Sequence, residues 1–159
     1  MSKDLDIDLE TLAEQYPDAA KKFLALKEAL DSKTLQREGK DNFIRYVKHM
    51  WTDFIEGEHH KIFAQKLEDV ANGKIKRLIV NMPPRHTKSE FASTFFPSWL
   101  LGRNPKLKLM QITHTAELAF RFGRKVRDII DSEEYKQVFP DVSLKQDSKS
   151  AGRWETNKG

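Results

Sequence analysis

The sequence predicts an α/β fold in which an incomplete parallel sheet follows a helical N-terminal segment. Two observations support this prediction. Short apolar runs alternate with helical patterns after residue 74, whereas the chain before residue 58 shows helical periodicity alone. We therefore expect a helical segment over residues 1–57 and a sheet-bearing domain over residues 58–159.

The N-terminal segment is predicted to contain three helices. Apolar residues recur at helical spacing within residues 9–15, 19–30 and 42–54. Residues 32–40 are polar and lack apolar periodicity, which indicates a loop between the second and third helices.

Helices and strands alternate in the remaining chain. The expected elements are a helix over 60–72, a strand over 78–81, a helix over 89–101, a strand over 107–113, a helix over 116–131 and a third strand from 153. Gly73 is a natural stop for the first of these helices. Because short apolar strands joined through helices are typical of parallel sheets, we expect the strands to lie parallel.

The segment RLIVNMPPRHTKS, from Arg77 to Ser89, contains the most informative motif. An apolar strand leads into a tight loop that ends in Lys-Ser at the start of a helix, where free N–H groups and the helix dipole favour an anion. Lys88 is placed to reach the β- and γ-phosphates of a nucleotide, and the Ser89 hydroxyl to hold Mg²⁺. The pattern predicts an incomplete P-loop NTPase sheet with ATP and Mg²⁺ as cofactors. The predicted binding residues are Pro84, Arg85, His86, Thr87, Lys88 and Ser89. For Arg85 the alternative is a solvated surface side chain, and for His86 solvent exposure is favoured over phosphate contact.

The loop departs from the usual pattern G-x-x-x-x-G-K-[ST], because Met82 and Thr87 hold the two glycine positions. Glycine before the lysine allows backbone dihedrals that other residues avoid. A positive φ at the β-branched Thr87 would cost roughly 1–3 kcal/mol. Either the loop takes a conformation that threonine tolerates, or nucleotide binding is weaker than usual. An ordinary strand–loop–helix connection is the structural alternative.

Four blocks of sequence resemble the large terminase subunits of tailed bacteriophages, which are DNA-packaging motors. In chain order they are NMPPRHTKSEFAS (81–93), PSWLLGRNP (97–105), QITHTAELA (111–119) and RFGRKVR (121–127). The resemblance extends over residues 55–159, and the first block is similar to the family's Walker A loop. That loop commonly reads PPRHGKS in the family, so Thr87 departs from it at one position.

The resemblance implies an ATP-driven motor that packages double-stranded viral DNA into procapsids in the host cytoplasm. It implies that Arg85 senses or stabilises the γ-phosphate, so that Arg85 and Lys88 are the catalytic candidates. It also implies a homo-oligomeric ring in the full-length protein, with the portal and the small terminase subunit as partners.

The family carries a Walker B acid pair and a C-terminal nuclease domain, and neither has a counterpart here. Glu133 and Glu134 follow a helix rather than a buried strand, so they are poor substitutes. We therefore expect residues 58–159 to be a partial P-loop ATPase domain, truncated before Walker B. The parent protein would be an ATPase, whereas this chain alone should bind nucleotide and turn over little or none.

A basic cluster on the predicted helix 116–131 is a candidate DNA contact. Arg121, Arg124 and Lys125 are spaced to lie on one helix face, opposite the apolar residues. A packaging motor needs basic groups that grip phosphates without reading sequence. A solvated charged face is the structural alternative.

Several aromatic residues and histidines have both a functional and a structural interpretation. The resemblance implies adenine contacts upstream of the loop, which Trp51 and Phe54 could supply, although core packing is favoured. His59 and His60 lack the spacing and acidic partners of a metal site, so structural roles are favoured. His114 follows the second predicted strand, where it could neighbour the phosphate site.

The composition sets limits on the kind of protein. Lysine and arginine total 28 against 24 for aspartate and glutamate, and the net charge of +4 permits nucleic-acid contact without requiring it. The absence of cysteine excludes disulfides and cysteine metal sites and agrees with a reducing compartment. No apolar run approaches membrane-spanning length, so no membrane partner is expected.

Two other classes of protein stay open on the sequence. One is a different P-loop ATPase, such as a helicase-like translocase, which downstream Walker B and coupling motifs would distinguish. The other is a truncated, non-catalytic remnant that kept the helices and lost the chemistry.

Overall fold

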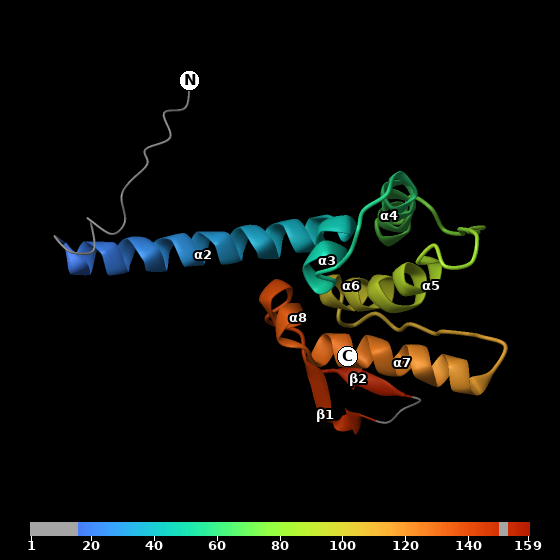
Figure 1. Cartoon of the computed structure of the whole chain (residues 1–159). Helices are drawn as coiled ribbons and strands as arrows, with labels where there is room; N and C mark the ends of the chain where they lie inside the picture. Colours follow the sequence, from blue (N-terminus) through green and yellow to red (C-terminus); the bar gives the residue numbers. More distant parts are fainter. Residues whose placement is uncertain (1–15, 150–152) are drawn as a thin grey trace. The chain divides into compact units, whose positions relative to one another are not determined.

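The computed structural model describes residues 16–149 and 153–159. One compact unit ends at Leu35, and a second runs from Gln36 to Gly159. The described helices are α2 (Pro17–Asp41), α3 (Phe43–Met50), α4 (Glu58–Ala71), α5 (Lys88–Glu90), α6 (Phe96–Arg103), α7 (Ala116–Asp131) and α8 (Glu133–Val138) (Figure 1). A π-helical turn, η1 (Phe91–Phe95), joins α5 to α6, and two strands follow α8: β1 (Leu144–Lys149) and β2 (Trp154–Thr156). The helix predicted over 9–15 lies outside the described residues.

The loop predicted over residues 32–40 is wrong, because α2 continues through it to Asp41. Residues 32–38 contain neither proline nor glycine, so their polar character does not interrupt the helix. Gly39 serves packing instead of breaking the helix. Its carbonyl accepts a 2.8 Å hydrogen bond from the Trp99 indole, and a Cβ there would lie 2.7 Å from Val138 Cγ1.

The helices α3, α6 and α8 meet in an aromatic core. The fully buried rings include Phe43, Tyr46, Phe91, Trp99, Tyr135 and Phe139. Ser98 bonds to two polar groups of this core through its hydroxyl, which donates to the Phe95 carbonyl at 2.8 Å and accepts from the Tyr46 hydroxyl at 2.7 Å. The Ser98 carbonyl accepts from the Tyr135 hydroxyl at 3.0 Å. Burial raises the pKa of both tyrosines, which act as neutral donors here.

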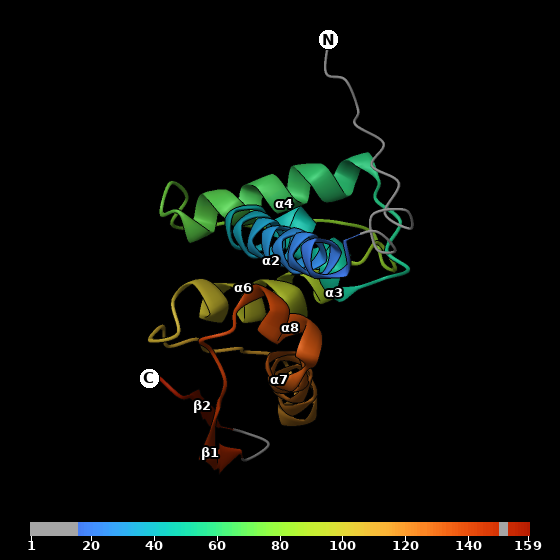
Figure 2. The same ribbon diagram turned by 90° about the vertical axis from the view of Figure 1, so that its left-hand side faces the viewer.

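The segments α5, η1 and α6 form one continuous helical run from Lys88 to Arg103. The π-turn shows in the hydrogen bond from the Phe96 N–H to the Phe91 carbonyl, five residues back. Pro97 has no N–H to offer to the Ser93 carbonyl, which instead accepts from Gln111 Nε2 at 2.6 Å. Figure 2 shows α4 and α7 on opposite sides of this helical run.

The predicted parallel sheet is wrong. Residues 78–81 and 107–113 form no strand pairing within the described chain, and its sheet is the antiparallel pair β1–β2. An apolar run becomes a strand only where a second strand supplies hydrogen-bond partners, and neither segment has one here. Several of their apolar side chains remain exposed: Ile79 is 88%, Met110 84% and Ile112 83% accessible.

The third predicted strand is present as β2, paired with β1 and not with a parallel neighbour. The β1–β2 hairpin lies beside α7 (Figure 1), where the Trp154 indole donates to the Gly123 carbonyl at 3.1 Å. Thr156 Oγ1 donates to the Pro105 carbonyl at 2.7 Å. These side-chain bonds hold the hairpin against the helical part of the second unit.

The structure also bears on the membrane prediction. Across residues 16–149 and 153–159, no helix combines the length and the apolar character needed to span a bilayer.

Candidate phosphate-binding loop

The loop before α5 has the backbone conformation that glycine usually provides. Arg85 has φ 65° and Thr87 has φ 57°, and within the described chain these are the non-glycine residues with positive φ. Thr87 also has ψ 7°, in the left-handed region that β-branched residues rarely occupy. The loop therefore does not take a conformation that threonine tolerates freely, and the strain costs roughly 1–3 kcal/mol. Weaker nucleotide binding stays a prediction.

A chain of hydrogen bonds joins Thr87 to the start of α4. The Gly57 N–H donates to His60 Nδ1 at 2.9 Å, so the neutral ring carries its proton on Nε2. Nε2 is 2.7 Å from Thr87 Oγ1 and therefore donates to it. The Thr87 hydroxyl in turn donates to the His86 carbonyl at 2.7 Å. The donor and the acceptor of each hydrogen bond in this series are thus assigned without conflict.

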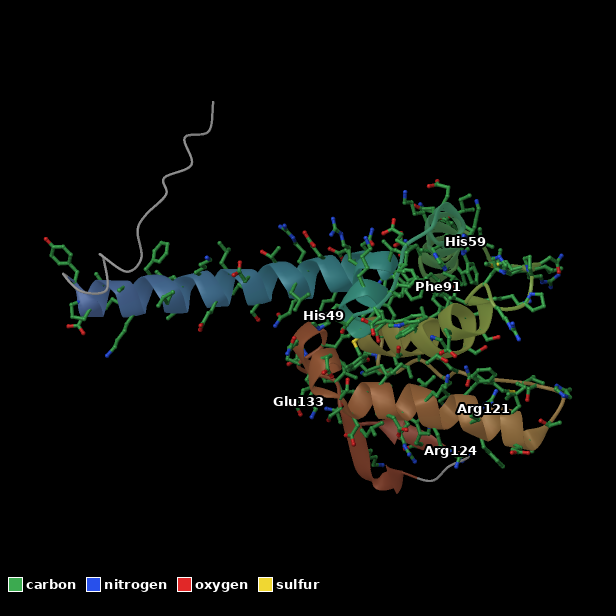
Figure 3. The ribbon with its side chains drawn as sticks, viewed as in Figure 1. His49, His59, Phe91, Arg121, Arg124 and Glu133 are labelled. Atoms are coloured by element: carbon green, nitrogen blue, oxygen red, sulfur yellow. The ribbon has the colours of Figure 1, made fainter. Side chains whose placement is uncertain are left out.

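The His60 ring is held on several sides. It is only 6% exposed and packs against the rings of Phe54 and Phe91, at centroid distances of 4.8 and 5.3 Å. The His59 ring lies 3.8 Å from the His60 ring, and Figure 3 labels His59 and Phe91. Burial, with a smaller contribution from His59, lowers the pKa of His60 and favours the neutral ring.

Lys88 and Ser89 begin the helical run. Lys88 is half-buried, and its Nζ donates to the Met82 carbonyl at 3.3 Å, across the base of the loop. No ion pair of the described chain engages Lys88. Ser89 is exposed. Its hydroxyl is therefore open to a ligand from solvent.

The first N–H groups of this run point to an anion site. The Phe91 N–H donates to the Thr87 carbonyl at 3.0 Å. The preceding N–H groups, of Lys88, Ser89 and Glu90, have no acceptor among the residues that the structure describes. Such groups at a helix N-terminus are available to an anion.

The other predicted loop residues lie at the surface. Pro84, Arg85 and His86 are exposed. His86 Nδ1 donates to the Pro84 carbonyl at 2.9 Å, a contact internal to the loop. The exposed Arg85 guanidinium is therefore positioned on the same loop as Lys88, with solvent around it.

The predicted DNA-binding cluster on α7 is divided by an ion pair. Lys125 Nζ lies 2.7 Å from Glu90 Oε1, so its charge is compensated by the helical run that begins at the loop. Arg121 and Arg124 are exposed on α7 (Figure 3). The Arg121 guanidinium lies 5.9 Å from the Phe122 ring centroid. Two of the three basic residues thus remain candidates for a phosphate contact.

The aromatic pair proposed for an adenine pocket belongs to the edge of the core. Trp51 stacks on Phe95 with centroids 5.9 Å apart, and Phe54 lies 5.6 Å from Phe91. His114 has no hydrogen bond or ring contact to the loop in the described structure. No group of three or more potential ligands there is arranged to hold a metal ion.

His60 is the residue that sequence reasoning missed. The pair His59-His60 was interpreted as structural, and 27 residues separate His60 from its partner Thr87. The one available signal was a threonine at a glycine position, since a strained residue with a hydroxyl invites a stabilising partner. The sequence alone does not identify that partner.

A lysine ammonium, a serine hydroxyl and three N–H groups without an acceptor in the described structure thus belong to the end of one loop, a set of groups that can bind an anion. We compared the chain with models of known protein families, with curated proteins and with solved structures, and none of them matches it.

Proposed function

We propose that residues 84–89 bind the phosphates of Mg–ATP and that the chain is part of a large terminase subunit, the ATP-driven motor that packages double-stranded DNA. The observation that carries the phosphate proposal is the left-handed backbone at Thr87, directly before Lys88 and the unbonded N–H groups of the helical run. That backbone is the one for which the motif normally uses glycine. The motor proposal rests on the resemblance.

Each loop residue has a chemical role in this proposal. Lys88 leaves the Met82 carbonyl, which it contacts at a long 3.3 Å, for the stronger charge-assisted bonds of the β- and γ-phosphates. The exposed Ser89 hydroxyl is a suitable Mg²⁺ ligand, because Mg²⁺ in such sites takes few protein oxygens beside phosphate and water. Arg85 contacts the γ-phosphate from the exposed side of the loop.

The proposal includes binding with little hydrolysis by these 159 residues. The carboxylate next to the loop, Glu90, is paired with Lys125 and is not poised to activate water. In the full-length motor, the partners proposed from the resemblance are double-stranded DNA, the portal, the small terminase subunit and further copies in a ring, in the host cytoplasm.

Calorimetry of Mg–ATP binding tests the phosphate proposal. The purified chain should bind Mg–ATP, and Lys88→Ala should abolish the binding because it removes the ammonium that meets the phosphates. Thr87→Gly should bind at least as tightly as the natural chain, since glycine adopts this backbone without strain. Equal, negligible heats for all three proteins, each shown to be folded by circular dichroism, would refute it.

The salt dependence of DNA binding tests the motor proposal at α7. We expect Arg121→Ala/Arg124→Ala to weaken binding to random-sequence duplexes and to reduce the slope of log K against log salt by roughly one per lost phosphate contact. Lys66→Ala, which changes an exposed lysine on α4, is the matched control. An unchanged slope in the double variant would remove α7 from the DNA interface.

A further inference from the structure

The strained conformation of Thr87 requires a partner that holds it. Within the loop, the Thr87 hydroxyl reaches only the adjacent His86 carbonyl at 2.7 Å, and that bond does not tie the residue to another element. The contact that does so is the 2.7 Å bond from His60 Nε2, which comes from α4. Left-handed residues other than glycine persist where their surroundings fix them.

His60 is itself fixed before it meets Thr87. It is the third residue of α4, and its Nδ1 accepts from the Gly57 N–H, one half of a capping box. Glycine has no side chain, so the other half of the box is absent. One ring nitrogen is bonded to the helix start, Phe91 stacks on the ring, and Phe54 and His59 lie against it with centroids 4.8 and 3.8 Å away, so Nε2 is held as a donor toward Thr87.

We propose that His60 is a positioning residue of the phosphate loop, which holds Thr87 in the left-handed conformation through its Nε2–H bond to the hydroxyl. In this way α4 takes over a task that a glycine would perform through its own backbone freedom. The effect on phosphate affinity rests on the proposed function. The effect on the backbone of Thr87 does not.

The proposal makes the two residues dependent on each other. If His60 acts through the Thr87 hydroxyl, its loss should matter only while residue 87 is a threonine. With glycine at position 87, the loop keeps its conformation without a partner, and His60 becomes dispensable for binding. A merely structural histidine would be equally costly to lose in both backgrounds.

The experiment combines a ligand-independent and a ligand-dependent measurement on the purified 159-residue chain. NMR reports the φ angle of Thr87 through its HN–Hα coupling and ¹³C shifts, without nucleotide. Calorimetry then gives the Mg–ATP affinity of the natural chain, His60→Phe, His60→Gln, Thr87→Gly and the double variant His60→Phe/Thr87→Gly. His114→Phe, at an exposed position without a hydrogen bond or ring contact to the loop in the described structure, is the matched control.

We expect His60→Phe to change the Thr87 coupling and to weaken Mg–ATP binding by roughly 2- to 10-fold, the worth of one hydrogen bond. His60→Gln retains a side-chain N–H and should restore part of both, and it decides the matter if the phenylalanine variant does not fold. In the T87G background, His60→Phe should leave the affinity unchanged.

An unchanged Thr87 coupling in folded His60→Phe would overturn the proposal. So would an equal loss of affinity in the threonine and glycine backgrounds. If no protein of the set binds Mg–ATP, the proposed function fails, while the coupling still decides whether His60 positions Thr87.

Discussion

The substitution Thr87→Val removes the hydroxyl that accepts from His60 on α4 and donates to the exposed His86 carbonyl. Valine keeps the β-branching of threonine, so the left-handed strain stays. The His60 Nε2–H, in a ring that is 6% exposed, then has no acceptor. Leaving such a donor unsatisfied costs about 1–3 kcal/mol, and partial access of water through the exposed loop favours the lower half of that range.

Urea unfolding followed by circular dichroism measures this cost. We expect a lower midpoint with an unchanged m-value, because the substitution alters stability and not the surface exposed on unfolding. Thr113→Val is the matched control: its hydroxyl donates to the Thr115 carbonyl in an exposed turn, and its loss should cost less than about 0.5 kcal/mol. If Thr87→Val were as stable as the natural chain, the bond to His60 would not support the strained loop.

Three further predictions follow from buried groups. Thr94 Oγ1 is buried without a hydrogen-bond partner in the described structure, so Thr94→Val should stabilise the chain by about 1 kcal/mol in urea unfolding; a loss of stability would reveal a hidden partner. Gly102→Ala should destabilise by about 1–3 kcal/mol, because the new Cβ would lie 2.5 Å from the Phe139 ring; an unaltered thermal midpoint would contradict that packing. The pKa of His60 is lowered in the folded state, so its contribution to stability is full above about pH 6.5 and falls as the pH drops below that value. Unfolding free energies at pH 7.5 and 5.5 should therefore differ more for the natural chain than for His60→Gln, and equal differences would show that His60 is not responsible.

Elements whose signals are local were predictable from the sequence. The helix predicted over 116–131 matches α7 (Ala116–Asp131), since an apolar stripe fixes its face and Thr115 caps it by accepting from the Leu118 N–H. Gly73 ends α4 with φ 74°, as its position indicated. In both cases the residues that decide the structure are neighbours along the chain.

Features that depend on distant partners were not predictable. The runs 78–81 and 107–113 have the composition of strands, but pairing depends on what lies beside them, and the described chain puts no strand there. At the candidate site, the loop sequence located the strained residue, whereas its support from His60 depends on how α4 packs. The position of Thr87 in the motif is visible in the sequence, whereas the position of His60 beside it is visible only in the three-dimensional structure.

The π-turn η1 sets the angular position of the loop around its helix. A π-turn behaves as an α-helix with one extra residue, and each residue advances about 100° around the axis. Removal of the exposed Ala92 would make the run uniformly α-helical and would rotate the residues before it around the axis by about that angle, which would separate Thr87 from His60. The angular position of the candidate loop thus depends on a single inserted residue in the helix that follows it.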